Sequence, residues 1–217
     1  MMLQGNCTQE EWVVRGALCE LLAKSLKLPT RELAEALVSG EFGEAFVEIG
    51  ESVGIDPSIL AQSQQRLAEY QGQDSEELFH NLRIEYTRLF VGAPNPVVWP
   101  YAGVWHALEQ GVEPLMFVNP RTIEIERFMK SCGIGQSEGR NEPLDHIATE
   151  FEFLQYLALV NAGAILVSEG VDMSDDAFGS FLSRYVASWA GGLAQKVLKA
   201  TKSAFYQAVA QFVQVLL

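Results

Sequence analysis

The chain has 217 residues, of which 48% are hydrophobic, so it is long and apolar enough to fold around a core. Its 28 acidic and 15 basic side chains give a net charge of −13, which argues against a nucleic acid as its partner. The same negative charge suits a basic partner and also keeps a protein soluble without serving any partner.

Helix-start signals recur through the first half of the chain. Thr8-x-x-Glu11 is a capping box, and Asp56-Pro57 combines an N-cap residue with proline at the first helical position. Thr30 and Asp74 precede further segments with apolar residues at helical spacing. These signals predict five helices, which cover about residues 9–26, 31–38, 42–53, 57–67 and 75–91.

The segment Glu85–Trp105 differs from its surroundings because it is apolar without being periodic. Gly92 is expected to end the fifth helix, and Pro94, Pro96 and Pro100 are expected to keep the chain extended as far as Trp105. An apolar, proline-stiffened loop either lines a groove between helices or is buried as a connector, and the residues alone leave both readings open. We expect residues 92–119 to link two helical lobes of one domain that spans residues 1–217.

The second half again shows helical patterns. Asn119-Pro120 repeats the cap-and-proline signature, and Pro143 is expected to open the longest helix, which would run to about Glu169. Ser174 is expected to cap a further segment of two helices, with a break at Gly191-Gly192. Since no alternating strand pattern is found, the sequence predicts an all-α protein, a single globular bundle of about nine or ten helices.

Few residues have a pattern that indicates catalysis or metal binding. His146 and Glu150 share a helix face, and Glu77-x-x-His80 has a spacing known from di-iron bundles, but such a bundle needs this motif twice. We find no phosphate-binding loop and no Gly-x-Ser-x-Gly element. We therefore expect no catalytic residue, no metal ligand and no cofactor, which means that the protein is not an enzyme.

The three cysteines and the N-terminus indicate where the protein works. No Cys-x-x-Cys pair occurs, so reduced thiols in the cytoplasm fit better than a disulfide framework or a zinc site. No basic segment followed by an apolar run is found at the N-terminus, and no apolar stretch is long enough to cross a bilayer. We expect a cytoplasmic protein with neither a signal peptide nor a membrane insertion.

Two segments together resemble the TorD/DmsD family of redox-enzyme maturation chaperones. They read EYTRLFVG…PYAGVW and NEPLDHIATEFEFL, and their order and spacing match the family pattern. The resemblance implies a TorD-like helical fold in which the matching residues bind a peptide. These residues are Tyr86, Leu89, Phe90, Gly92, Pro100, Tyr101, Asp145 and His146.

The resemblance also implies a function. It predicts a cytoplasmic chaperone that binds the twin-arginine leader, and also the folded body, of a molybdopterin-type oxidoreductase and delays export until the cofactor is inserted. We expect Asp145 at the rim of the groove, where it would meet a leader arginine. Of the adjacent Leu89 and Phe90, one is expected in the core and the other in the groove, since neighbours on a helix point about 100° apart.

The chain departs from the family pattern at several positions. Tyr86 stands where tryptophan is frequent, Ala102-Gly103 replaces Gly-Ser, and Tyr185 replaces a histidine. These departures leave open the branch of the family and the client enzyme, and the sequence also leaves the oligomeric state open. Two alternative functions are a metal- or nucleotide-dependent hydrolase on a helical bundle and a structural adaptor for a basic subunit.

Overall fold

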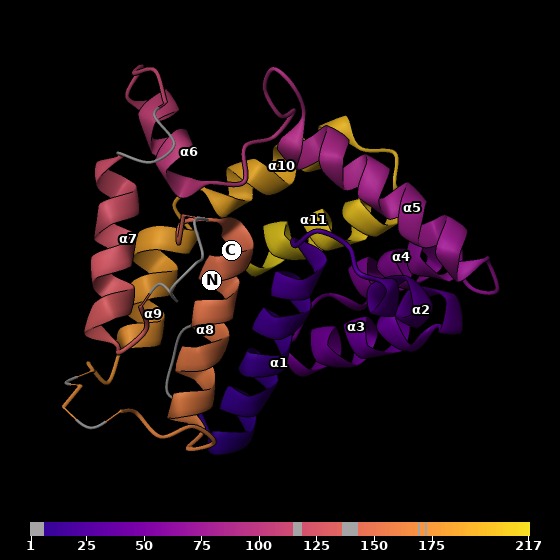
Figure 1. Cartoon of the computed structure of the whole chain (residues 1–217). Coiled ribbons are helices and arrows are strands. Elements are labelled where there is room, and N and C mark those ends of the chain that lie inside the picture. The colour runs from indigo at the N-terminus through magenta and orange to yellow at the C-terminus, as the bar shows by residue number, and fades with distance from the viewer. Residues whose placement is uncertain (1–6, 115–118, 136–142, 169, 172) are drawn as a thin grey trace. The chain divides into compact units, whose positions relative to one another are not determined.

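The computed structural model describes residues 7–114, 119–135, 143–168, 170–171 and 173–217 (Figure 1). Within these ranges the chain forms eleven α-helices and two π-helical turns, and its one strand-like pairing is an isolated bridge between Tyr101 and His146. The predicted all-α class is confirmed. None of the helices in these ranges is long and apolar enough to cross a membrane.

The chain divides into two compact units, and we describe each by itself. Of the described residues, the first unit holds 24–98 and 191–217, and the second holds 7–23 and 99–190. The helices of the first unit are α2 (Arg31–Ser39), α3 (Glu41–Ser52), α4 (Pro57–Ala68), α5 (Ser75–Tyr86), η1 (Thr87–Val91), α10 (Ala190–Ala200, all but its first residue) and α11 (Ala204–Leu216).

The predicted caps start three helices of the first unit. The side chains of Thr30, Asp56 and Asp74 accept backbone N–H groups in the first turns of α2, α4 and α5. Each bond satisfies a donor that would otherwise have no intrahelical partner, which explains why these helices begin where the sequence predicts.

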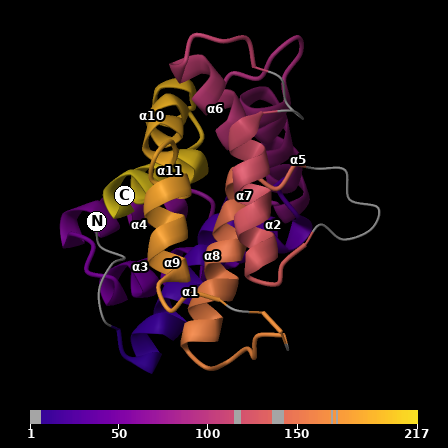
Figure 2. The ribbon, with the colours of Figure 1, turned by 90° about the vertical axis from the view of Figure 1, so that its left-hand side faces the viewer.

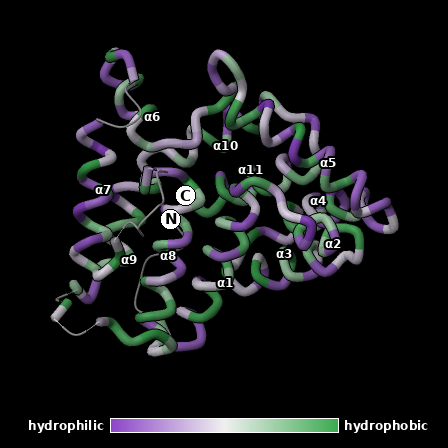
Figure 3. Tube along the Cα trace, viewed as in Figure 1, coloured by the Kyte–Doolittle hydropathy of each residue, from purple (hydrophilic) through white to green (hydrophobic). Residues whose placement is uncertain are grey.

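Helix α11 provides the core of the first unit. Its aromatic side chains meet those of other helices: the ring centroids of Phe46 and Phe212 lie 4.1 Å apart, and those of Phe90 and Tyr206 lie 6.0 Å apart. Figure 3 shows α11 as mostly hydrophobic. Nine of its thirteen residues are buried, so most of the circumference of this helix is shielded from solvent.

The second unit contains most of α1 (Gln9–Ser25) together with α6 (Ala102–Glu109), α7 (Pro120–Ser131), α8 (Ile147–Asn161), α9 (Ala177–Phe181) and the π-turn η2 (Leu182–Val186). Figure 2 shows α7, α8 and α9 side by side. Phe128, Phe153, Phe181 and Tyr185 form an aromatic cluster here, with ring centroids between 4.7 and 6.2 Å apart. This cluster joins α7, α8, α9 and η2.

Several predicted boundaries are wrong. Pro143 does not open the longest helix, because α8 begins only at Ile147 and ends at Asn161, well before Glu169, and α1 with 17 residues is longer than α8 with 15. Residues 102–105, expected to be extended, form the first turn of α6. Gly191-Gly192 is no break, since both glycines lie inside α10.

Candidate functional site

The segment from α5 through η1 presents one buried and one exposed side within the first unit. Tyr86, Leu89 and Phe90 are buried, with exposed fractions of 7%, 0% and 4%. The expectation that only one of Leu89 and Phe90 belongs to the core is therefore wrong. The ring of Phe90 packs against Tyr206 of α11, and the carbonyl of Leu89 accepts the N–H of Val98 from the returning loop, so this turn is covered on two sides.

Gly92 closes this turn at a place where a side chain would be crowded by backbone atoms. Its N–H donates to the carbonyl of Thr87 across 2.7 Å, which is the five-residue bond of a π-turn. A Cβ atom here would lie 3.1 Å from the carbonyl oxygen of Asn95 and 3.2 Å from Cα of Pro96. Gly92 thus acts by allowing the loop to fold back, which is a structural role.

The exposed positions of the same segment include three large apolar side chains besides the polar Thr87 and Arg88. Ile84 is 68% exposed, Val91 is 58% exposed, and Val97 in the following loop is 50% exposed. Ile84 lies in the last turn of α5, Val91 ends the π-turn η1, and Val97 lies in the loop that follows. We call Ile84, Val91 and Val97 the apolar stripe. Sequence reasoning assigned peptide contact to the motif residues and missed these three.

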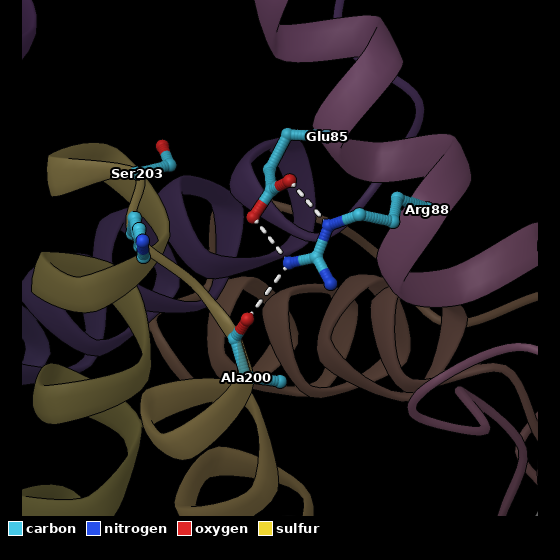
Figure 4. Close-up of a pocket in the computed structure, with 5 residues that line it drawn as sticks. Glu85, Arg88, Ala200 and Ser203 are labelled. Atoms are coloured by element: carbon cyan, nitrogen blue, oxygen red, sulfur yellow. Dashed lines mark hydrogen bonds and ion pairs between the residues drawn. The ribbon is translucent and has the colours of Figure 1, made fainter.

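A pocket of about 430 Å³ lies in the first unit and is lined by Glu85, Arg88, Ala200, Lys202 and Ser203 (Figure 4). Nε and Nη2 of Arg88 donate to the two carboxylate oxygens of Glu85, each across 2.7 Å. Nη2 also donates to the carbonyl of Ala200 across 2.8 Å. The hydrogen bonds from Arg88 lower the pKa of Glu85 most strongly, and the hydroxyl of Thr201 adds to this effect against partial burial.

Pro100, Tyr101, Asp145 and His146 come together in the second unit. The N–H of Ala102 donates to the carbonyl of Asp145 across 3.0 Å, and the N–H of Ile147 donates to the carbonyl of Pro100 across 2.9 Å. The rings of Tyr101 and His146 meet edge to face at 5.2 Å between centroids. The two motifs are therefore joined by a short antiparallel bridge.

Asp145 does not lie at a rim. Its exposed fraction is 0%, so the sequence expectation of a carboxylate open to a leader arginine is wrong for this position. Oδ2 accepts the N–H of Gly103 and the hydroxyl of Thr122, each across 2.8 Å, and thereby holds the starts of α6 and α7. Burial raises the pKa of Asp145, although the bonds from Gly103 and Thr122 act in the opposite direction.

His146 is also buried, with 4% of its surface exposed. Its Nδ1 accepts the N–H of Ala148 across 3.2 Å, so this side chain is the N-cap of α8. An imidazole nitrogen used in this way must carry a lone pair, which fixes the ring in the tautomer with the proton on Nε2. His146 and Asp145 thus share one task, since each holds the start of a helix.

Glu150 lies one turn into α8 and is completely buried. Oε2 accepts the indole N–H of Trp189 across 3.1 Å, whereas Oε1, like Oδ1 of Asp145, has no hydrogen-bond partner among the described residues. Burial, followed by the charge of Asp145, raises the pKa of Glu150 well above its usual value. The sequence pattern placed Glu150 beside His146 but carried no sign of Trp189, which lies 39 residues further along the chain.

The described residues contain no group of three or more His, Cys, Asp or Glu side chains arranged to hold a metal ion. In the Glu77-x-x-His80 segment, His80 and Glu77 are both exposed, and Nε2 of His80 instead contacts Glu76 at 3.1 Å.

The known proteins that resemble this chain belong to related groups. A family model described as the nitrate reductase delta subunit matches residues 56–195, more than half of the chain. Chaperone protein TorD of Vibrio parahaemolyticus is 25% identical over 193 residues, which cover 88% of this chain and 83% of that protein. TorD of Vibrio cholerae is 26% identical over 140 residues, which cover 64% of this chain and only 60% of that protein's length.

A solved structure has the same fold. It is that of a protein from Archaeoglobus fulgidus assigned to redox enzyme maturation, with a TM-score of 0.55 and 19% sequence identity. The superposition covers 98% of this chain and 94% of the other.

Proposed function

Because the chain belongs to the nitrate reductase delta subunit family and is similar to TorD chaperones, we propose that it is a maturation chaperone for a redox enzyme. It acts by recognition and not by catalysis. Its client is a molybdopterin-type oxidoreductase, whose twin-arginine leader it holds in the cytoplasm until the cofactor has been inserted. It also contacts the folded body of the client.

The observation that carries this proposal is the apolar stripe. Three large apolar side chains are at least half exposed on the segment that carries the family motif, and we take them as parts of one binding surface. The apolar part of a leader, helical when bound, would lie along Ile84, Val91 and Val97, as amphipathic helices do in grooves. Leu89 and Phe90 support this surface from beneath.

The second-unit motif residues have a different part in the proposal. Tyr101 is partly exposed and is the member of this group able to touch a peptide, whereas Pro100, Asp145 and His146 are buried. We assign these three to the positioning of Tyr101, through the bridge to His146 and the ring contact between the two side chains.

Titration calorimetry with a synthetic twin-arginine leader peptide tests the proposal. Replacing an apolar side chain by serine removes part of a contact in which full burial contributes about 1.5–3 kcal/mol. We expect Ile84→Ser and Val91→Ser each to weaken leader binding by about fivefold or more, while the melting temperature stays within a degree or two because both residues are exposed.

Val13→Ser is a matched control, because Val13 is 49% exposed on α1 and lies outside the motif. Its leader affinity is expected to equal that of the parent. If the parent binds no leader peptide, the proposed function is wrong; if it binds and both stripe variants bind equally well, the leader occupies another surface. A pull-down with a client that lacks its leader tests separately whether the folded body is also bound.

A further inference from the structure

The guanidinium of Arg88 donates three hydrogen bonds to acceptors within the first unit. The two carboxylate oxygens of Glu85 accept hydrogen bonds from Nε and Nη2, and the carbonyl of Ala200 accepts a second bond from Nη2 (Figure 4). This bidentate contact allows a carboxylate to distinguish arginine from lysine, because the ammonium group of lysine does not present two parallel N–H donors.

The acceptors are positioned independently of Arg88. The hydroxyl of Thr201, which follows α10, donates to Oε1 of Glu85 and fixes this carboxylate from another part of the chain. Ala200 is the last residue of α10, where backbone carbonyls have no intrahelical partner and the helix dipole is negative. A guanidinium-binding site therefore exists here as a property of Glu85 and the end of α10.

Arg88 is the replaceable member of this arrangement. Its side chain is 44% exposed, whereas that of Glu85 is 20% exposed, and an open pocket of about 430 Å³ adjoins both. When another guanidinium enters, Arg88 can turn into solvent without leaving a buried charge behind. Lys202 also lines this pocket, but it is exposed and has no bonding partner among the described residues, so it can turn away from an incoming cation.

We propose that Glu85 and the carbonyl end of α10 form an arginine subsite which Arg88 fills in the free protein, and that an arginine of the leader peptide displaces Arg88 on binding. This inference rests on the proposed function and refines it, because it names the residues that read the twin-arginine signal. In sequence, Ile84 and Val91 of the apolar stripe lie on either side of Arg88.

The subsite can be tested without any leader. In Arg88→Ala the acceptors are unfilled, so L-arginine ethyl ester, used at about 50 mM, should raise the melting temperature of this variant by mass action. The parent should respond less, because its subsite is already filled. L-lysine ethyl ester at the same concentration controls for ionic strength and for the positive charge of the side chain.

The double variant Glu85→Gln/Arg88→Ala lacks the charged acceptor and should show no preference for the arginine ester. If arginine and lysine esters shift Arg88→Ala equally, or if the double variant still prefers arginine, the subsite assignment is wrong. This outcome is independent of whether the protein binds leaders at all.

The leader experiment then relates the subsite to function. A charged hydrogen bond contributes about 1.5–3 kcal/mol, so Glu85→Gln should weaken binding of a twin-arginine peptide by about tenfold or more. Arg88→Ala removes the internal competitor and should tighten binding by several-fold. Lys199→Ala, which removes an exposed positive charge in the last turn of α10, controls for the change in net charge and should have a smaller effect.

A second peptide has lysine in place of both arginines. Its affinity should differ between the parent and Arg88→Ala by no more than it differs between the parent and Lys199→Ala. If the twin-arginine peptide binds the parent, Glu85→Gln and Arg88→Ala equally well, the subsite is refuted while the proposed function stands. If the parent binds no leader, the proposed function fails, and the ester experiment still decides whether the subsite exists.

Discussion

The backbone N–H of Gly103 donates to Oδ2 of Asp145 across 2.8 Å, although the two residues are 42 positions apart. A carboxylate from the segment before α8 therefore satisfies a donor in the first turn of α6, where the helix dipole also favours a negative charge. The two motifs that carry the family resemblance meet in this bond and in the bridge beside it. Their joint presence in the chain thus has a structural cause within the second unit.

The first prediction concerns the space around Gly103. A Cβ atom at this position would lie 2.5 Å from Oγ1 of Thr122 and 2.9 Å from Oδ2 of Asp145, so Gly103→Ala must displace both bonding partners. We expect a loss of about 1–3 kcal/mol in the free energy of unfolding, measured with urea. Gly191→Ala is the control, because nothing lies within 4 Å of its added Cβ, and inside α10 alanine is expected to be neutral or stabilising.

The second prediction concerns Asp145 itself. Asp145→Ala leaves the N–H of Gly103 and the hydroxyl of Thr122 without their acceptor in a buried place, at a cost of about 1–3 kcal/mol for each orphaned group. We expect a clear fall in the melting temperature. Asp175→Ala, which changes an exposed carboxylate, should melt like the parent. An unchanged melting temperature for Asp145→Ala would contradict the role of this carboxylate in holding α6 and α7.

Local signals explain which parts of the fold were predictable. Thr30, Asp56, Asp74 and Asn119 each cap the helix that follows, so the cap and the helix are encoded within a few residues. Helix α6 was missed because the acceptor for Gly103 comes from Asp145, which gives no signal near Ala102. The late start of α8 has a similar cause, since the bridge to Tyr101 occupies the residues before Ile147.

The candidate site was predictable as a segment but not as side chains. The motif drew attention to the segment around Arg88, on which the proposed binding surface lies, yet the assumption of regular helix geometry divided Leu89 and Phe90 between core and surface. A π-turn together with coverage by α11 and by the returning loop buries both. The pocket beside Glu85 was missed because three of its lining residues, Ala200, Lys202 and Ser203, are more than a hundred positions away in the sequence.

The third prediction separates support from surface in this turn. Leu89→Ala should cost about 2–5 kcal/mol of stability, because Leu89 is fully buried. Val91→Ala, two positions further, changes a side chain that is 58% exposed and should cost less than about 0.5 kcal/mol. Urea unfolding of the two variants under one set of conditions checks the difference. Similar stabilities would show that Leu89 does not belong to the core of the first unit.

The fourth prediction concerns the negative charge of the protein. Under the proposed function, the net charge of −13 would attract a cationic leader over distances at which salt screens exposed charges, about 10 Å at 0.1 M ionic strength. We expect the dissociation constant of a twin-arginine leader to rise as sodium chloride increases from about 50 to about 500 mM. A peptide with neutral residues in place of the arginines should show a weaker salt dependence. Equal dependence would assign the acidic surface to solubility alone.

The last prediction follows from the buried carboxyl of Glu150. Burial and the neighbouring Asp145 raise its pKa in the folded state, whereas Trp189 and Arg121 act in the opposite direction with less effect. The folded protein then holds a proton that the unfolded chain releases above about pH 4.5. Stability contributed by this proton is complete at low pH and is lost as the pH rises toward the folded-state pKa.

Glutamine has the same shape and no charge, and its carbonyl can still accept the indole N–H of Trp189. Glu150→Gln should therefore be more stable than the parent at about pH 8, and the difference should shrink toward about pH 5. Glu85, whose pKa is lowered, acts with the opposite sign, because its contribution is lost as the pH falls through its own range. Urea unfolding at about pH 5, 6.5 and 8 measures how the free energy of unfolding changes with pH. Glu109→Gln, which changes an exposed carboxylate, should leave this pH dependence unaltered. If Glu150→Gln and the parent change in parallel with pH, Glu150 does not hold a proton in the folded protein.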